Sequence, residues 1–105
     1  MSEENQFIVP PSFIELFVEP GRLKPRESRE HIAQRYEYCE DLAQMLGETA
    51  RDKLWQLQVT EADVLERMHR GLLAGDTGVD AAEATWVMRR VAELLGWDDP
   101  WREAP

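Results

Sequence analysis

One stretch of the sequence, residues 28–57, constrains the fold most, because its apolar residues recur at steps of three and four. That spacing places side chains on one face of an α-helix and predicts a single long helix from Ser28 to Leu57. Gly47 lies inside this helix and a break there is the alternative, but the apolar phase continues through it and favours continuity. The start is also open, because either Ser28 caps the helix or it begins earlier, with Pro25 in the first turn. The predicted apolar face consists of Ile32, Tyr36, Cys39, Ala43, Leu46, Ala50, Leu54 and Leu57.

A short helix is predicted near the N-terminus, over residues 12–18. Ser12 followed by Glu15 has the spacing of a capping box, in which each side chain bonds a backbone N–H of the first turn. The helix is apolar on nearly every side, so it is either enclosed in the fold or part of an interface.

Two further helices are predicted after residue 57, over residues 61–73 and from residue 81 onwards. Each follows a polar capping residue with an acid three positions later. The two capping pairs are Thr60 with Asp63 and Asp80 with Glu83. Gly96 is expected to end the last helix in a left-handed conformation, with Trp97 folded back on the final turn. The expected buried side chains are Val64, Leu65, Met68, Leu72 and Leu73 in one helix and Ala84, Val87, Val91, Leu94 and Leu95 in the other, with Trp86 beside them.

The sequence has no strand pattern and no internal repeat, so the predicted fold class is all-α. Short connections favour a small antiparallel helical bundle of three main helices plus the short N-terminal helix. A chain of 105 residues is expected to form one domain, with residues 1–6 and 98–105 as flexible tails.

The charge balance limits the partners of this chain. Its formal net charge is −9, which argues against binding to nucleic acid or to an anionic membrane surface. Cys39 is the single cysteine, so no internal disulfide is possible, and the chain is expected to be intracellular. It has neither a signal peptide nor an apolar run that could cross a bilayer, which favours a cytoplasmic location.

Reactive groups are sparse, and we expect neither an enzyme nor a cofactor. Neither lysine follows a glycine, so no phosphate-binding loop is present. Glu66 and His69 have the E-x-x-H spacing of di-iron bundles, but that spacing occurs once and such bundles need it twice. A carboxylate and histidine site for a metal or small ligand is therefore the alternative interpretation. Cys39 is either a nucleophile or a buried thiol, and its place on the apolar face favours burial.

Two surfaces are candidates for partner binding. The first is formed by aromatic residues near the two termini, which either cap the bundle or form an exposed interface; they are Phe13, Phe17, Trp97 and Trp101. The second is an acidic face on the long helix, which either recruits a basic partner or is a solvated surface; it contains Glu37, Asp41, Glu48 and Asp52.

Four segments resemble a family of short proteobacterial proteins. They are residues 7–13 (FIVPPSF), 35–42 (RYEYCEDL), 62–72 (ADVLERMHRGL) and 93–97 (ELLGW). Some members of that family are labelled as ATPases with chaperone activity, but the missing phosphate-binding loop conflicts with that label. The resemblance implies a bacterial cytoplasmic protein and assigns no role to any residue. From its candidate surfaces and its lack of a catalytic motif, we predict a non-catalytic protein–protein interaction module, a small adaptor or regulator. Its partner is either an unknown protein or a second copy of the chain, which would form a homodimer.

Overall fold

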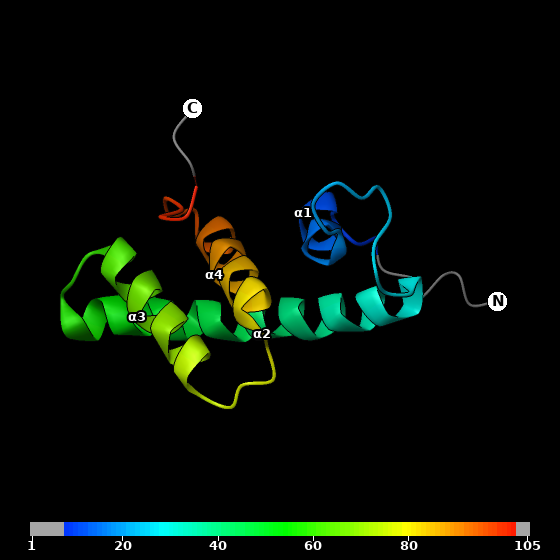
Figure 1. Ribbon diagram of the computed structural model, residues 1–105. Helices are drawn as coiled ribbons and strands as arrows, with labels where there is room; N and C mark the ends of the chain where they lie inside the picture. The colour runs from blue at the N-terminus through cyan, green and yellow to red at the C-terminus, as the bar shows by residue number, and fades with distance from the viewer. Residues whose placement is uncertain (1–7, 103–105) are drawn as a thin grey trace.

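The computed structural model describes residues 8–102, and every regular element in that range is helical (Figure 1). The elements are α1 (Pro11–Ile14), the 3-10 turn η2 (Glu15–Phe17), α2 (Arg29–Leu57), α3 (Glu61–Ala74) and α4 (Ala81–Leu95). The predicted all-α fold class is therefore confirmed. The flexible tail predicted at residues 1–6 lies outside the described residues. Within residues 8–102, no helix combines the length and the apolarity that crossing a membrane requires.

Helix α2 is continuous along the stretch that the sequence marks out. The Ser28 hydroxyl caps its first turn by accepting a hydrogen bond from the backbone N–H of His31 at 3.1 Å, so Ser28 and not Pro25 sets the start. The helix passes through Gly47 without a break, as the unshifted apolar phase predicts. Its buried residues are Ile32, Cys39, Ala43, Gly47 and Ala50.

The caps of the later helices are local features, and they follow the sequence closely. Thr60 Oγ1 accepts a hydrogen bond from the backbone N–H of Asp63 at 3.0 Å. Asp80 and Glu83 form both hydrogen bonds of a capping box at the start of α4. Gly96 ends α4 with a φ of 72°, the left-handed conformation expected there.

Three leucines that were expected to be buried are exposed: Leu57, Leu73 and Leu94. Leu57 lies in the final turn of α2, beyond the last buried residue of that helix. Leu73 and Leu94 each adjoin a leucine that packs inwards, and neighbours on a helix point about 100° apart, so both cannot face the core.

Helix α1 begins differently from the prediction. Its N-cap is Pro10, which provides no side-chain hydrogen bond, and the capping box expected between Ser12 and Glu15 is absent. The Ser12 hydroxyl instead accepts a hydrogen bond from the indole Nε1–H of Trp86 at 3.0 Å. A tertiary contact across 74 positions has therefore replaced the local cap.

The core lies between α2 and α4, with α3 packed against both helices. In Figure 1, α4 crosses α2, with α3 on one side of it and α1 on the other. Arg35 of α2 ties the start of α4 to α2: its guanidinium bonds both carboxylate oxygens of Glu83, at 2.9 and 2.8 Å, and the carbonyl oxygen of Gly78 at 2.6 Å. The largest fully buried side chains are Phe13, Leu65, Met88, Val64, Val87, Val91 and Cys39.

Candidate functional site

Phe13 is the centre of an aromatic cluster that joins α1 to α2 and α4. The centroid of its ring lies 5.5 Å from that of Phe17, 5.6 Å from that of Tyr36 and 5.0 Å from that of Trp86. Phe13 is 0% exposed and Phe17 is 5% exposed. Of the two alternatives for the terminal aromatic residues, capping of the bundle or an exposed interface, these two residues therefore follow the first. The Phe13 ring packs against Tyr36 of α2 and Trp86 of α4 and so holds α1 against these two helices.

The chain after α4 folds back along that helix. The backbone N–H of Trp97 donates to the carbonyl oxygen of Ala92 at 2.9 Å, which turns the chain after Gly96. Asp99 then accepts a hydrogen bond from Arg89 at 2.7 Å and another from the backbone N–H of Trp101 at 2.9 Å. Trp97 and Trp101 are both half-buried against the core. We call residues 96–102 the C-terminal turn.

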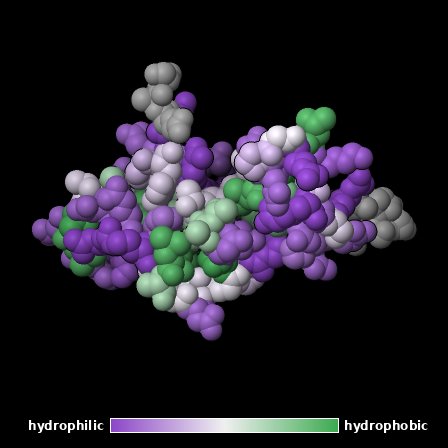
Figure 2. Space-filling view, in the orientation of Figure 1, coloured by the Kyte–Doolittle hydropathy of each residue, from purple (hydrophilic) through white to green (hydrophobic). Residues whose placement is uncertain are grey.

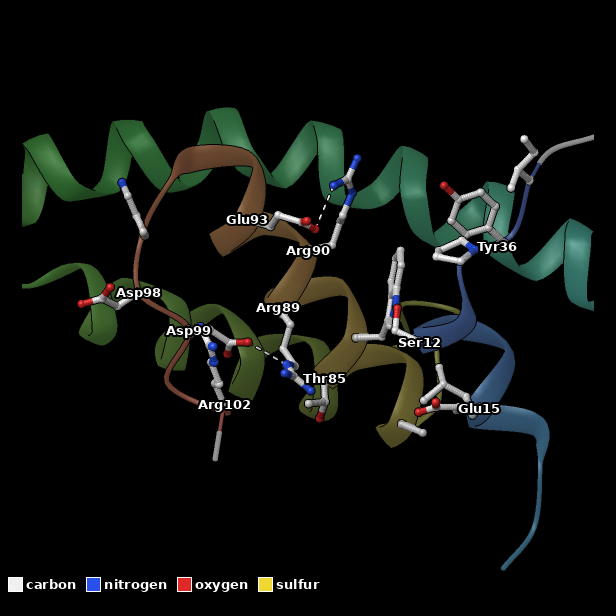
Figure 3. A pocket seen from close by; sticks show the side chains of 16 residues that line it. Ser12, Glu15, Tyr36, Thr85, Arg89, Arg90, Glu93, Asp98, Asp99 and Arg102 are labelled. Carbon is white, nitrogen blue, oxygen red and sulfur yellow. Dashed lines mark hydrogen bonds and ion pairs between the residues drawn. The ribbon is translucent and has the colours of Figure 1, made fainter. Parts of the chain in front are cut away.

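A groove of about 1090 Å³ lies between α1 and the C-terminal turn, with α4 along its floor (Figure 3). Figure 3 shows Ser12 and Glu15 on the α1 side, with Asp98, Asp99 and Arg102 on the opposite side. The larger aliphatic and aromatic side chains that line the groove are Ile8, Leu16, Tyr36, Trp86 and Trp97, and Pro10 and Ala82 line it as well. Many lining residues are solvent-exposed, Ile8 at 91%, so the site is an open groove and not a closed cavity.

The arginines of α4 in the groove are neutralised by carboxylates. Arg90 bonds both oxygens of Glu40 at 2.9 Å and one oxygen of Glu93 at 2.9 Å. The hydrogen bonds from Arg90 lower the pKa of the Glu40 carboxyl and keep it ionised. Arg89 is paired with Asp99 in the same way. The groove therefore carries both signs of charge, and it is not selective for anions or cations by charge alone.

Histidine and cysteine do not occur among the groove residues that lie within positions 8–102. The Ser12 hydroxyl, the one serine there, accepts the indole hydrogen bond of Trp86.

His69 and Glu66, the candidate metal ligands, are not brought together with further ligands. His69 Nε2 lies 3.0 Å from the Thr85 hydroxyl, and its ring centroid lies 5.0 Å from that of Trp101. The Thr85 hydroxyl also lies 3.2 Å from the carbonyl oxygen of Ala81. Glu66 is exposed. No group of three metal-ligating residues occurs between residues 8 and 102.

Cys39 is buried in the core, as its position on the apolar face favours. Burial raises the pKa of the thiol to about 12, so it is protonated at neutral pH. A protonated and inaccessible thiol is a poor nucleophile.

The predicted acidic face does not contribute to the groove. Its four members, Glu37, Asp41, Glu48 and Asp52, are all exposed along α2. The acid of α2 that reaches α4 is Glu40, which pairs with Arg90 at the edge of the groove.

Sequence reasoning missed the groove because its walls are far apart in the chain. Ile8, Arg89 and Arg102 line it together, yet no spacing in the sequence brings them into one pattern. The nearest signal in the sequence is the pair of aromatic-rich termini; of those four aromatic residues, Trp97 lines the groove.

Comparison of the chain with protein-family models, curated proteins and solved structures found no match. The resemblance to short proteobacterial proteins therefore stays a prediction.

Proposed function

We propose that this protein is a non-catalytic protein–protein interaction module, a small adaptor or regulator, whose groove between α1 and the C-terminal turn binds a segment of a partner protein. The observation that supports this function is the groove itself, which is open, has aromatic and aliphatic side chains along it and carries paired charges at its edges. Peptide segments bind in such grooves by placing apolar side chains against aromatic walls.

The shape of the groove favours a protein segment over a small molecule. Small-molecule sites enclose most of the ligand surface. This groove is open to solvent, and its lining residues Glu15, Glu93 and Arg102 are all exposed. The two walls of the groove are already attached to α4, α1 through Phe13 and the C-terminal turn through Asp99. Binding of a partner therefore costs little conformational entropy in these walls.

Other features of the assembly belong to the same proposal. We infer that α2, α3 and α4 form an antiparallel bundle, that the protein acts in the cytoplasm of a bacterium, and that a homodimer is the simplest alternative to a foreign partner.

Affinity capture from native cytoplasm, with quantitative mass spectrometry, tests the groove. The test variant is Ile8→Glu combined with Arg102→Glu, because both residues are exposed and line the groove. The matched control is Met45→Glu with Arg51→Glu, which likewise replaces one exposed apolar residue and one exposed arginine by glutamate, but on α2. We expect the wild type and the control to capture the same partner and the groove variant to lose it about tenfold or more.

Two results would contradict the proposal. One is equal capture of every partner by the groove variant and the wild type. The other is that the wild type captures no partner and light scattering shows a monomer, because neither a foreign protein nor a second copy then binds.

A further inference from the structure

The loop between η2 and α2 carries a local excess of positive charge in a strongly acidic protein. Arg22, Lys24 and Arg26 lie within residues 20–26, a range that contains no acid, and Arg29 follows at the start of α2. We call residues 20–26 the basic loop. Its charge is opposite to the net charge of −9 of the whole chain.

Arg26 attaches the C-terminal end of the basic loop to η2. The backbone N–H of Arg26 donates to the carbonyl oxygen of Phe17 at 2.8 Å, and its guanidinium donates to that of Leu16 at 3.1 Å. The same guanidinium lies over the Phe17 ring, 5.3 Å from the centroid. Gly21 adopts a φ of 80°, which turns the chain before Arg22. Arg26 is therefore engaged within the protein and fixes the position of its neighbours.

Arg22 and Lys24 are left for contact with another molecule. Both are exposed, and within residues 8–102 neither side chain forms an ion pair or a side-chain hydrogen bond. Leu23 stands between them and is 97% exposed. Figure 2 shows a hydrophobic protrusion at this end of the molecule, next to surface of intermediate and hydrophilic character. One apolar side chain flanked by two exposed cations combines an anchor with electrostatic selection.

We propose that the basic loop binds an acidic segment of a partner protein, with Arg22 and Lys24 on carboxylates and Leu23 on an apolar residue between them. This surface is separate from the groove, and the inference does not depend on what the groove binds. The charge complementarity is local, because exposed acids at Glu19, Glu27 and Glu30 border the loop.

The acidic residues beside the basic loop favour a short acidic segment as its ligand over an extended anionic surface. A bilayer or a nucleic-acid duplex would meet these acids together with the cations, since electrostatic interactions extend about 8 Å at physiological salt. A single helix or strand with a few carboxylates touches the loop alone. The exposed leucine also has a natural contact in a protein segment, whereas a phosphate backbone offers it none.

Fluorescence anisotropy with labelled synthetic peptides tests this inference on the full chain. The probe is an amphipathic helical peptide with glutamates on one face and leucines along its border, and a second peptide has glutamine in place of every glutamate. We expect the acidic peptide to bind, the glutamine peptide to bind at least about tenfold more weakly, and salt between about 50 and 300 mM to weaken binding.

Variants assign the binding to the loop. Arg22→Glu with Lys24→Glu should weaken binding of the acidic peptide about tenfold or more, and Leu23→Ala should weaken it severalfold with the salt dependence retained. The matched control, Arg51→Glu with Lys53→Glu, reverses one arginine and one lysine that are exposed elsewhere on α2 and should bind like the wild type.

Three results would overturn the inference. They are no binding of the acidic peptide at low salt, equal binding by the loop variant and the control, and loop-dependent binding to vesicles of phosphatidylglycerol and phosphatidylcholine with none to the peptide. The last result would assign the loop to a membrane surface. Because the groove variants leave residues 20–26 unchanged, failure here is distinguishable from failure of the groove proposal.

Discussion

Phe13 connects three elements of the fold. Its ring is fully buried and contacts Phe17, Tyr36 and Trp86, so it joins the N-terminal segment to both α2 and α4. Phe13→Ala leaves a cavity at that junction, and we expect it to lower the free energy of unfolding by about 3–5 kcal/mol. Urea denaturation followed by circular dichroism measures the change.

A matched truncation separates this effect from a general response to losing an apolar side chain. Leu23→Ala removes an exposed leucine and should change the free energy of unfolding by no more than about 0.5 kcal/mol. A loss of less than about 1 kcal/mol in Phe13→Ala would show that α1 contributes little to the fold.

Glu83 should make the stability of the protein depend on pH. Burial of its carboxylate acts to raise the pKa, but the hydrogen bonds from Arg35 and from the backbone N–H of Asp80, with the charge of Arg35, lower it below its ordinary value of 4.5. A group whose pKa is lower in the folded state binds its proton less tightly there than in the unfolded chain. Its contribution to stability is therefore complete above pH 4.5 and is lost as the pH falls through the folded pKa.

Glu83→Gln tests this contribution, because glutamine keeps an acceptor for the capping box but carries no charge. We expect the free energy of unfolding at pH 7 to fall by about 1.5–3 kcal/mol and to depend less on pH between about 5 and 3 than in the wild type. Glu48→Gln, an exposed acid of α2, is the control. An unchanged pH profile in Glu83→Gln would contradict the role of the Arg35 pair.

At the scale of elements, the glycines of α2 and of the end of α4 should respond in opposite ways to alanine. A Cβ at Gly47 would lie 3.8 Å from Leu95 Cδ2, an ordinary contact, so Gly47→Ala should raise the free energy of unfolding by about 0.5–1 kcal/mol. Gly96 has a φ of 72°, a left-handed conformation that alanine adopts only with strain. Gly96→Ala should therefore lower the free energy of unfolding by about 1 kcal/mol. Thermal denaturation of the two variants measures both changes. Destabilisation by Gly47→Ala would contradict the ordinary van der Waals separation between Gly47 and Leu95.

The elements that were predicted well are those whose signals are local. Ser28, Thr60 and Asp80 each cap the helix that the sequence assigns to them, because the cap bonds a backbone N–H three residues away. Ser12 has the same local pattern but bonds Trp86. With only four residues in α1, a local cap has little helix to stabilise, and a partner 74 positions away competes successfully.

At the scale of the whole molecule, the sequence predicted the fold class but not the surface that we propose to be functional. Periodicity identifies the face of a helix that is buried, which is why Cys39 and Ala43 were assigned correctly. The groove depends on how α1 and the C-terminal turn are held against α4, through contacts such as Arg89 with Asp99 and Phe13 with Trp86. Pairs of this kind are set by packing in three dimensions and have no signature in the spacing of residues.

The central claim is that the groove between α1 and the C-terminal turn is where this protein meets its partner. Amide chemical-shift mapping of the ¹⁵N-labelled chain, titrated with the captured partner, tests it most directly. We predict that the largest perturbations fall on Ile8, Leu16, Arg89 and Trp97, which line the groove, while Met45 and Asp52 on the outer face of α2 stay unchanged. Perturbations confined to the outer face of α2, with the groove residues unaffected, would contradict the account.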